Sequence, residues 1–143
     1  MALKVELKPG ERIIIGKSVI TNDNQRTRLY IESKAPILRE KDILTSETAD
    51  TPAKRVYLAI QLMYLGGDMT ALQKDYFALV IDIVKAAPST LPIVDRINSA
   101  ILSGTLYKAL KEAKGLIAYE SELLEIASGD GASGMRAITG SAG

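Results

Sequence analysis

The sequence contains no cysteine, no histidine and no tryptophan, and only one phenylalanine. Without cysteine and histidine, the chain cannot form disulfides, zinc sites of the usual Cys/His kind, or Ser-His-Asp and Cys-His catalytic groups. A general base would have to be Asp, Glu, Lys or Tyr, and the spacing of Glu6, Glu11 and Glu32 does not indicate a carboxylate pair. We therefore expect no enzyme, with no catalytic residues, no metal and no cofactor.

Long apolar runs are also missing, since no segment approaches the roughly 20 apolar residues that span a bilayer. The opening residues MALKVELKPGE carry no apolar signal segment either. These absences predict a cytoplasmic protein with no membrane partner. The 143 residues are 47% hydrophobic and 24% charged, which fits one compact unit or two small units that share a core.

The net charge of +1 is unevenly distributed along the chain. Residues 1–45 hold nine Lys/Arg and six Asp/Glu, a charge of +3, whereas residues 46–143 hold nine and eleven, a charge of −2. A basic excess this small does not prove a nucleic-acid partner, because solubility of a strand-rich surface explains it equally well. It does indicate which part of the chain to examine first.

The first part of the chain reads as a series of short strands. Pro9 and Gly10 suit a tight turn, so we expect Val5–Leu7 to fold back onto Arg12–Ile15 as a hairpin. Further strand-like segments follow at residues 18–21, 26–32 and 36–39, with a polar turn at 22–25. A sheet this small needs a covering helix or a second chain, and open edges favour a homodimer.

The later part of the chain reads as helices. Thr51 and Pro52 suit the N-cap and first position of a helix that Gly66-Gly67 would end. A capping box at Thr70 and Gln73 predicts a second helix, which Pro88 would stop. A third would end near Gly104 and a fourth would begin near Thr105. Their predicted buried stripes are Ile93, Ile97 and Ile101, then Leu106, Leu110, Ala113, Ile117 and Leu124.

These patterns predict an α+β fold, a small antiparallel sheet followed by a bundle of about four helices. The boundaries fall at 1–45 for the β domain, 46–128 for the helical domain and 129–143 for a flexible tail. The tail holds Gly129, Gly131 and Gly134 at the spacing of a dinucleotide-binding fingerprint. A helix rather than a strand precedes them, so we regard the match as spurious.

Two surfaces are candidates for binding. Basic residues and one tyrosine in the β part could bind RNA: Arg12, Arg26, Arg28, Tyr30, Lys34, Arg39 and Lys41. Arg26, Arg28 and Tyr30 alternate along one strand and so share a face, where a base could stack on the ring. The alternatives are a solvated sheet face and, for Arg39, an ion pair with Glu40 or Asp42.

The second candidate surface is helical and would dock a protein. Its anchors would be aromatic residues, which are enriched at interface hot spots: Tyr57, Tyr64, Tyr76 and Phe77. A place in the core is the better interpretation for at least half of them.

The segments GERIIIG, RTRLYIE and ILREKDI resemble the carbon storage regulator (CsrA) family of small β-rich dimers that bind mRNA leaders. The likeness covers residues 4–43 and implies a CsrA-like sheet. It also places Arg39 where that family has an RNA-contacting arginine. The family's other RNA-contacting arginine precedes the first turn, where this chain has Leu7.

Over its whole length the sequence resembles the flagellin translation regulator FlbT family, through LKPGERIIIGKSVITND, RLYIE, APILREKDILT and ADTPAKRVYLAIQLMYL. That resemblance implies a post-transcriptional regulator of flagellum biogenesis that binds the 5′ untranslated leader of flagellin mRNA, represses translation and promotes mRNA degradation. It also implies a FlaF-type helical flagellar regulator as a partner. The alternative is a protein-binding adaptor, chaperone-like toward flagellar proteins, that uses the β part as a dimerisation scaffold.

Overall fold

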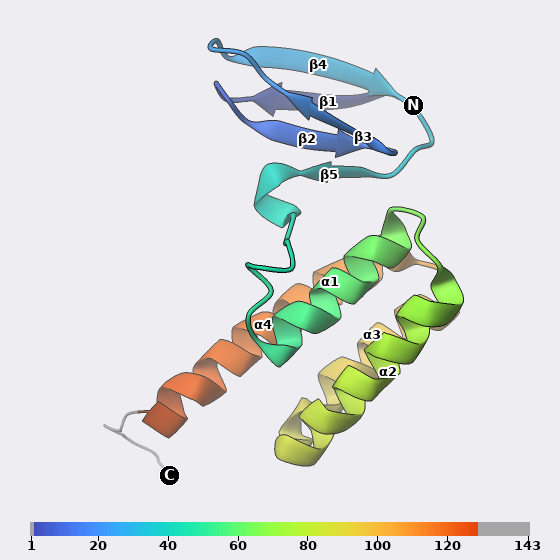
Figure 1. The fold of residues 1–143 in the computed structure, drawn as a ribbon, viewed down its shortest axis with the longest axis vertical. Helices are drawn as coiled ribbons and strands as arrows, with labels where there is room; N and C mark the ends of the chain where they lie inside the picture. Colours follow the sequence, from blue (N-terminus) through green and yellow to red (C-terminus); the bar gives the residue numbers. More distant parts are fainter. Residues whose placement is uncertain (1, 129–143) are drawn as a thin grey trace.

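A computed structural model describes residues 2–128 and confirms the α+β class, with a small β part followed by helices (Figure 1). The predicted tail at 129–143, with its glycine pattern, lies outside the described residues. The strands are β1 (Ala2–Leu7), β2 (Arg12–Ile15), β3 (Ser18–Thr21), β4 (Thr27–Glu32) and β5 (Ile37–Arg39). The helices are α1 (Pro52–Tyr64), α2 (Met69–Ala86), α3 (Leu91–Leu102) and α4 (Leu106–Ser128), with 3-10 turns η1 (Glu40–Asp42) and η2 (Pro88–Thr90).

The strands form two antiparallel sheets, β1-β4 and β3-β2-β5. The predicted hairpin between the first two strands is therefore wrong, since β1 pairs with β4 and β2 pairs with β3 and β5. The turn itself forms as expected: Glu11 N–H donates to the Lys8 carbonyl at 3.0 Å, and Gly10 has a φ of 76°. It leads from one sheet into the other.

Long-range hydrogen bonds explain why this turn does not close a hairpin. The Asn22 side-chain amide donates to the carbonyls of Lys8 and Gln25, both at 2.8 Å, and Gly10 N–H donates to the Asp23 carbonyl at 2.9 Å. The turn between β1 and β2 is thereby bonded to the turn between β3 and β4. With both turns joined at one end, β1 and β4 can pair as a separate layer.

Strands β2 and β5 of the middle sheet β3-β2-β5 carry apolar side chains on both faces, since successive side chains of a strand point to opposite sides, whereas β3 is exposed. Ile13 is fully buried against Val5 and Leu7 of β1. Ile14 and Leu38 point the other way and pack with the helical core. The protein therefore has three layers, with the middle sheet between β1-β4 and the helices (Figure 1).

The helix starts are only partly those predicted. Thr51 caps α1, its side chain accepting from Lys54 N–H at 3.2 Å, as expected. The predicted capping box of α2 is wrong: the carboxylate of Asp68 accepts from Thr70 N–H at 3.1 Å and Ala71 N–H at 3.4 Å. A charged acceptor also interacts favourably with the positive end of the helix dipole.

Helix α4 organises the bundle, since it packs against both α1 and α3, while α2 packs against α1. It runs unbroken through Gly115. Most of the predicted stripes are buried or half-buried, but Leu124 is 54% exposed. Leu124 lies in the last turns of α4, where it lines an open hollow together with residues of α1 and α2. Among residues 2–128, no helix combines the length and apolarity that a bilayer span requires.

Three side chains of α1 form hydrogen bonds with the segment from β5 to Leu44. The buried amide of Gln61 accepts from Leu44 N–H at 2.9 Å and donates to the Leu44 carbonyl at 3.0 Å. Tyr57 donates to the Asp42 carbonyl, and the Tyr64 hydroxyl lies 3.3 Å from the Ile37 nitrogen. These bonds position β5 and η1 on α1.

Gln61→Met should lower the free energy of unfolding by about 1–3 kcal/mol, because the Leu44 N–H and carbonyl would lose their partners inside the protein. Thermal and urea unfolding measure the change. Gln73→Met is the matched control, since Gln73 makes no side-chain hydrogen bond within residues 2–128. Equal stability of the two variants would contradict this role of Gln61.

Candidate nucleic-acid interface

The exposed side of β1-β4 carries the clearest cluster of predicted site residues. Along β4, Leu29 and Ile31 pack inward, while Arg28 and Tyr30 point outward. Tyr30 is 64% exposed, far more than a core tyrosine. On β1, Glu6 lies opposite Arg28 and Lys4 lies opposite Tyr30. We call this surface the outer face and define it by five residues: Lys4, Glu6, Arg26, Arg28 and Tyr30.

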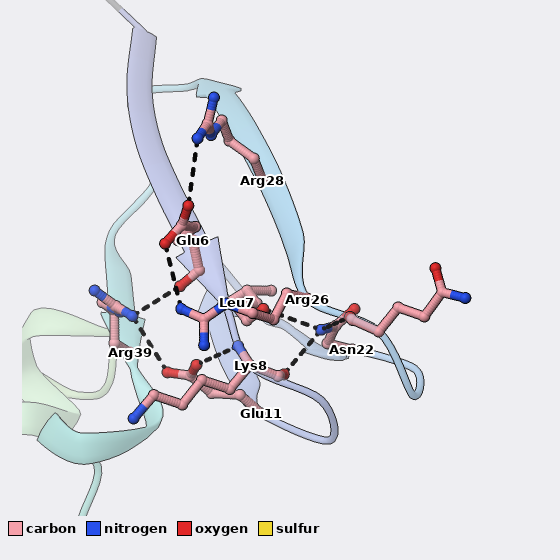
Figure 2. Close-up of polar contacts among 9 residues, drawn as sticks. Glu6, Leu7, Lys8, Glu11, Asn22, Arg26, Arg28 and Arg39 are labelled. Atoms are coloured by element: carbon pink, nitrogen blue, oxygen red, sulfur yellow. Dashed lines mark hydrogen bonds and ion pairs between the residues drawn. The ribbon is translucent and has the colours of Figure 1, made fainter.

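The outer face is basic and its arginines are already oriented. The Glu6 carboxylate accepts from Arg26 and Arg28, each at 3.4 Å (Figure 2). Arg28 and Arg26 together hold the pKa of Glu6 below its ordinary value of 4.5. All three side chains are more than half exposed, so the two ion pairs are weak and a phosphate could compete for the guanidinium groups.

Arg39 links the two sheets instead of projecting freely. Its Nη2 donates to the Glu6 carbonyl of β1 at 2.9 Å and to the Glu11 carboxylate at 3.4 Å (Figure 2). Its Nε is buried and has no hydrogen-bond partner among the described residues. The alternative considered for Arg39, an ion pair with Glu40 or Asp42, does not form, since Glu40 accepts from the Arg12 N–H and Asp42 pairs with Lys114.

Glu11 is the anionic partner of this link. Its carboxylate accepts from the Lys8 N–H at 2.9 Å, which is the main reason that the pKa of Glu11 lies below 4.5. Partial burial opposes this shift, and the charge of Arg39 adds to it. The turn predicted from Pro9-Gly10 therefore also fixes the acid that holds Arg39.

The remaining basic candidates lie on other elements. Arg12 is on β2, Lys34 is in the loop before β5, and Lys41 is in η1. All three are exposed. Within residues 2–128, none of them makes a side-chain hydrogen bond or ion pair with the outer face. The structure thus brings Arg26, Arg28 and Tyr30 together on the outer face. The other three candidates lie elsewhere.

The aromatic candidates divide between core and surface. Tyr57 and Tyr76 are buried, and burial raises the pKa of both phenols. Their hydroxyls donate to the Asp42 carbonyl and to Asn98. Tyr64 is half-buried against β5 and Phe77 is 40% exposed. The expectation that at least half belong to the core is confirmed.

Sequence reasoning missed Lys4 and Glu6 as members of this surface. Lys4 was not distinguishable from other solvated strand residues, and the role of Glu6 depends on the pairing of β1 with β4. The alternation of charged and apolar residues in β1 is the signal that places both on one face. Among residues 2–128, no three acidic side chains converge to form a metal site.

Acid should destabilise the fold partly through Glu6 and Glu11. Because the folded protein lowers both pKa values, their contribution is complete above pH 4.5 and is lost as the pH falls through the lowered values. The melting temperature of Glu6→Gln/Glu11→Gln should therefore depend less on pH than that of the parent between about pH 6 and about pH 3. The two proteins should have similar melting temperatures at about pH 3. Parallel curves of melting temperature against pH would contradict the stabilising role of the Glu6 and Glu11 carboxylates.

Comparison with known proteins places the chain in a family. Residues 3–124 match the family described as flagellar protein FlbT. The chain is 63% identical over 124 residues to "Probable flagellum biosynthesis repressor protein FlbT 1" of Bradyrhizobium diazoefficiens, covering 86% of this chain and 85% of that protein. It is 54% identical over 124 residues to "Probable flagellum biosynthesis repressor protein FlbT" of Rhodopseudomonas palustris, covering 87% of this chain and 98% of that protein.

A more distant relative covers even more of the chain. "Flagellum biosynthesis repressor protein FlbT" of Caulobacter vibrioides is 36% identical over 140 residues, which are 94% of this chain and 98% of that protein. No solved structure matches the chain. The family match extends from β1 into the C-terminal part of α4, so the sheets and the helices both lie within it. This protein belongs to the FlbT family of regulators of flagellum biosynthesis.

Proposed function

We propose that this FlbT-family protein is a post-transcriptional regulator that binds the 5′ untranslated leader of flagellin mRNA, represses translation and promotes degradation of the message. The relatives are named as repressors of flagellum biosynthesis, which supports a regulatory role. The outer face is the surface that we propose binds the RNA. Its five residues combine an exposed tyrosine with three cations and one carboxylate, and Glu32 on the same side of β4 adds a second carboxylate, which leaves a local charge of +1.

Single-stranded RNA suits this surface better than a duplex. An unpaired base can stack on the ring of Tyr30, and the neighbouring Arg28 and Lys4 can contact the flanking phosphates. The Glu6 carboxylate binds Arg26 and Arg28 only weakly and would compete with a phosphate for them. A phosphate that replaces the Glu6 carboxylate would find two guanidinium groups already aligned.

The resemblance of residues 4–43 to the CsrA family supports an RNA-binding sheet, with a different arginine arrangement. Leu7 is buried between the sheets, where a charged side chain would be costly. Arg39 is engaged by Glu6 and Glu11, so replacing it with alanine would disturb the contact between the sheets as well as any RNA contact. Tyr30 and Arg28 are exposed and therefore give a cleaner test.

Tyr30→Ala should weaken binding of flagellin leader RNA by about 1–3 kcal/mol through loss of base stacking. Tyr30→Phe keeps the ring and should bind like the parent. Arg28→Ala should weaken binding and reduce its salt dependence, whereas Arg96→Ala, which removes a similarly exposed arginine from α3, should not. Glu6→Gln should strengthen binding. Fluorescence anisotropy titration at fixed salt measures each affinity.

Parent-like binding by both Tyr30→Ala and Arg28→Ala would rule out the outer face as the RNA site. A parent protein that binds leader RNA only after a helical partner is added would favour the second candidate function, a protein-binding adaptor. The structure offers that function a specific surface, an apolar hollow of about 370 Å³ between α1, α2 and α4. Ile83, Leu116 and Leu123 line it, and a FlaF-type helical regulator is the partner that we propose for it.

We also propose that the protein is a homodimer formed through the β part. A two-stranded sheet is marginally stable alone, and β3 is an edge strand with Val19 63% exposed and Ile20 40% exposed. A second copy could cover this edge.

Light scattering at concentrations on the order of tens of micromolar should therefore return twice the chain mass. Val19→Lys should return a monomer, because a lysine on an edge strand opposes strand pairing. Leu124→Lys places the same charge at an exposed position of α4 and should leave the dimer intact. A monomeric parent would contradict the proposal.

A further inference from the structure

A basic hollow lies where η1, α1 and α4 meet. Its volume is about 190 Å³, and we call it the lysine hollow. Its lining consists of Lys41, Asp42, Leu44, Lys54, Tyr57, Lys114 and Ile117. The three lysines come from η1, α1 and α4, and Asp42 is the one acid in the lining among residues 2–128. The lining therefore has a charge of +2.

Two of the three lysines at the lysine hollow form ion pairs with acidic residues. The Asp42 carboxylate is mostly buried and pairs with Lys114. Lys54 in the first turn of α1 pairs at 3.2 Å with Asp50, which precedes the helix, and because Asp50 is exposed this ion pair is weak. Lys41 has no ion-pair partner within residues 2–128. An incoming phosphate would thus meet one free ammonium group and two that are held near the hollow.

A series of contacts connects this hollow to the outer face. Lys41 also lines a second hollow of about 380 Å³, together with Lys8, Glu11 and Glu40. Glu11 holds Arg39, and Arg39 reaches the backbone of Glu6 on the outer face (Figure 2). Cations are therefore present along the path from β4, past the turn between β1 and β2, to α1 and α4, while Glu11 and Glu40 balance the charges of Lys8 and Lys41 in the second hollow.

We propose that an RNA strand bound on the outer face continues past Lys41 into the lysine hollow, where Lys54 and Lys114 hold its backbone phosphates. The inference rests on the proposed function and extends the site from the β part to the helices. Leu44, Tyr57 and Ile117 supply an apolar floor on which a ribose can pack. Contacts to two phosphates add affinity but do not distinguish one base sequence from another. The lysine hollow would therefore strengthen the binding of flagellin leader RNA and of unrelated RNA equally.

The test compares Lys54→Gln/Lys114→Gln with Lys74→Gln/Lys85→Gln, which removes two exposed lysines of α2 that line neither hollow. Affinity for flagellin leader RNA is measured over a range of salt concentrations. Loss of two phosphate contacts should reduce the slope of log affinity against log salt by about 1.4, at about 0.7 for each contact with single-stranded RNA. The α2 variant should retain the parent's slope. Lys54→Arg/Lys114→Arg keeps both charges and should retain it as well.

Leader RNA shortened stepwise adds a second readout. For RNA too short to reach beyond the outer face, Lys54→Gln/Lys114→Gln should bind like the parent, and the difference should appear only above a threshold length. An unchanged slope in a variant that melts like the parent would overturn the lysine hollow while leaving RNA binding on the outer face intact. A parent that binds no leader RNA at low salt would overturn the proposed function and this inference together.

Discussion

Strands β2 and β5 of the middle sheet must bury apolar side chains on both faces, and the rest of the molecule is arranged around that requirement. Ile13 points toward β1-β4, whereas Ile14 and Leu38 point toward the helices. At about 1.5–3 kcal/mol for each large apolar side chain, exposing either face would cost a substantial part of a typical domain's stability. One layer of strands and one layer of helices are therefore both needed, which explains why a three-isoleucine strand occurs in so small a β part.

Burial of the inner surfaces also determines which polar groups reach the outside. Because Leu29 and Ile31 fill the space between the sheets, Arg28 and Tyr30 must face solvent on the same strand. Arg39 sits where the two sheets and the turn before β2 converge, and its bonds to Glu6 and Glu11 join them. The arrangement that holds the fold together thus presents a basic surface with one aromatic ring.

Local signals allowed much of the fold to be predicted, and the failures concern partners that are distant in sequence. The Pro9-Gly10 turn and the Thr51 cap formed as expected because neighbouring residues determine them. The pairing of β1 was missed because alternation shows which face of a strand is buried and not which strand lies beside it. The bonds from Asn22 and the meeting of Lys54 with Lys114 depend on the folded chain, so spacing could not indicate either.

Photo-crosslinking of the purified protein to flagellin leader RNA, with each adduct mapped to its residue, tests the central claim most directly. The account predicts adducts on Tyr30 and its neighbours on β1-β4, with further adducts around Lys41 and the lysine hollow on longer RNA. Adducts confined to the apolar hollow between α1, α2 and α4, or none in the absence of a partner protein, would contradict direct RNA binding by the outer face.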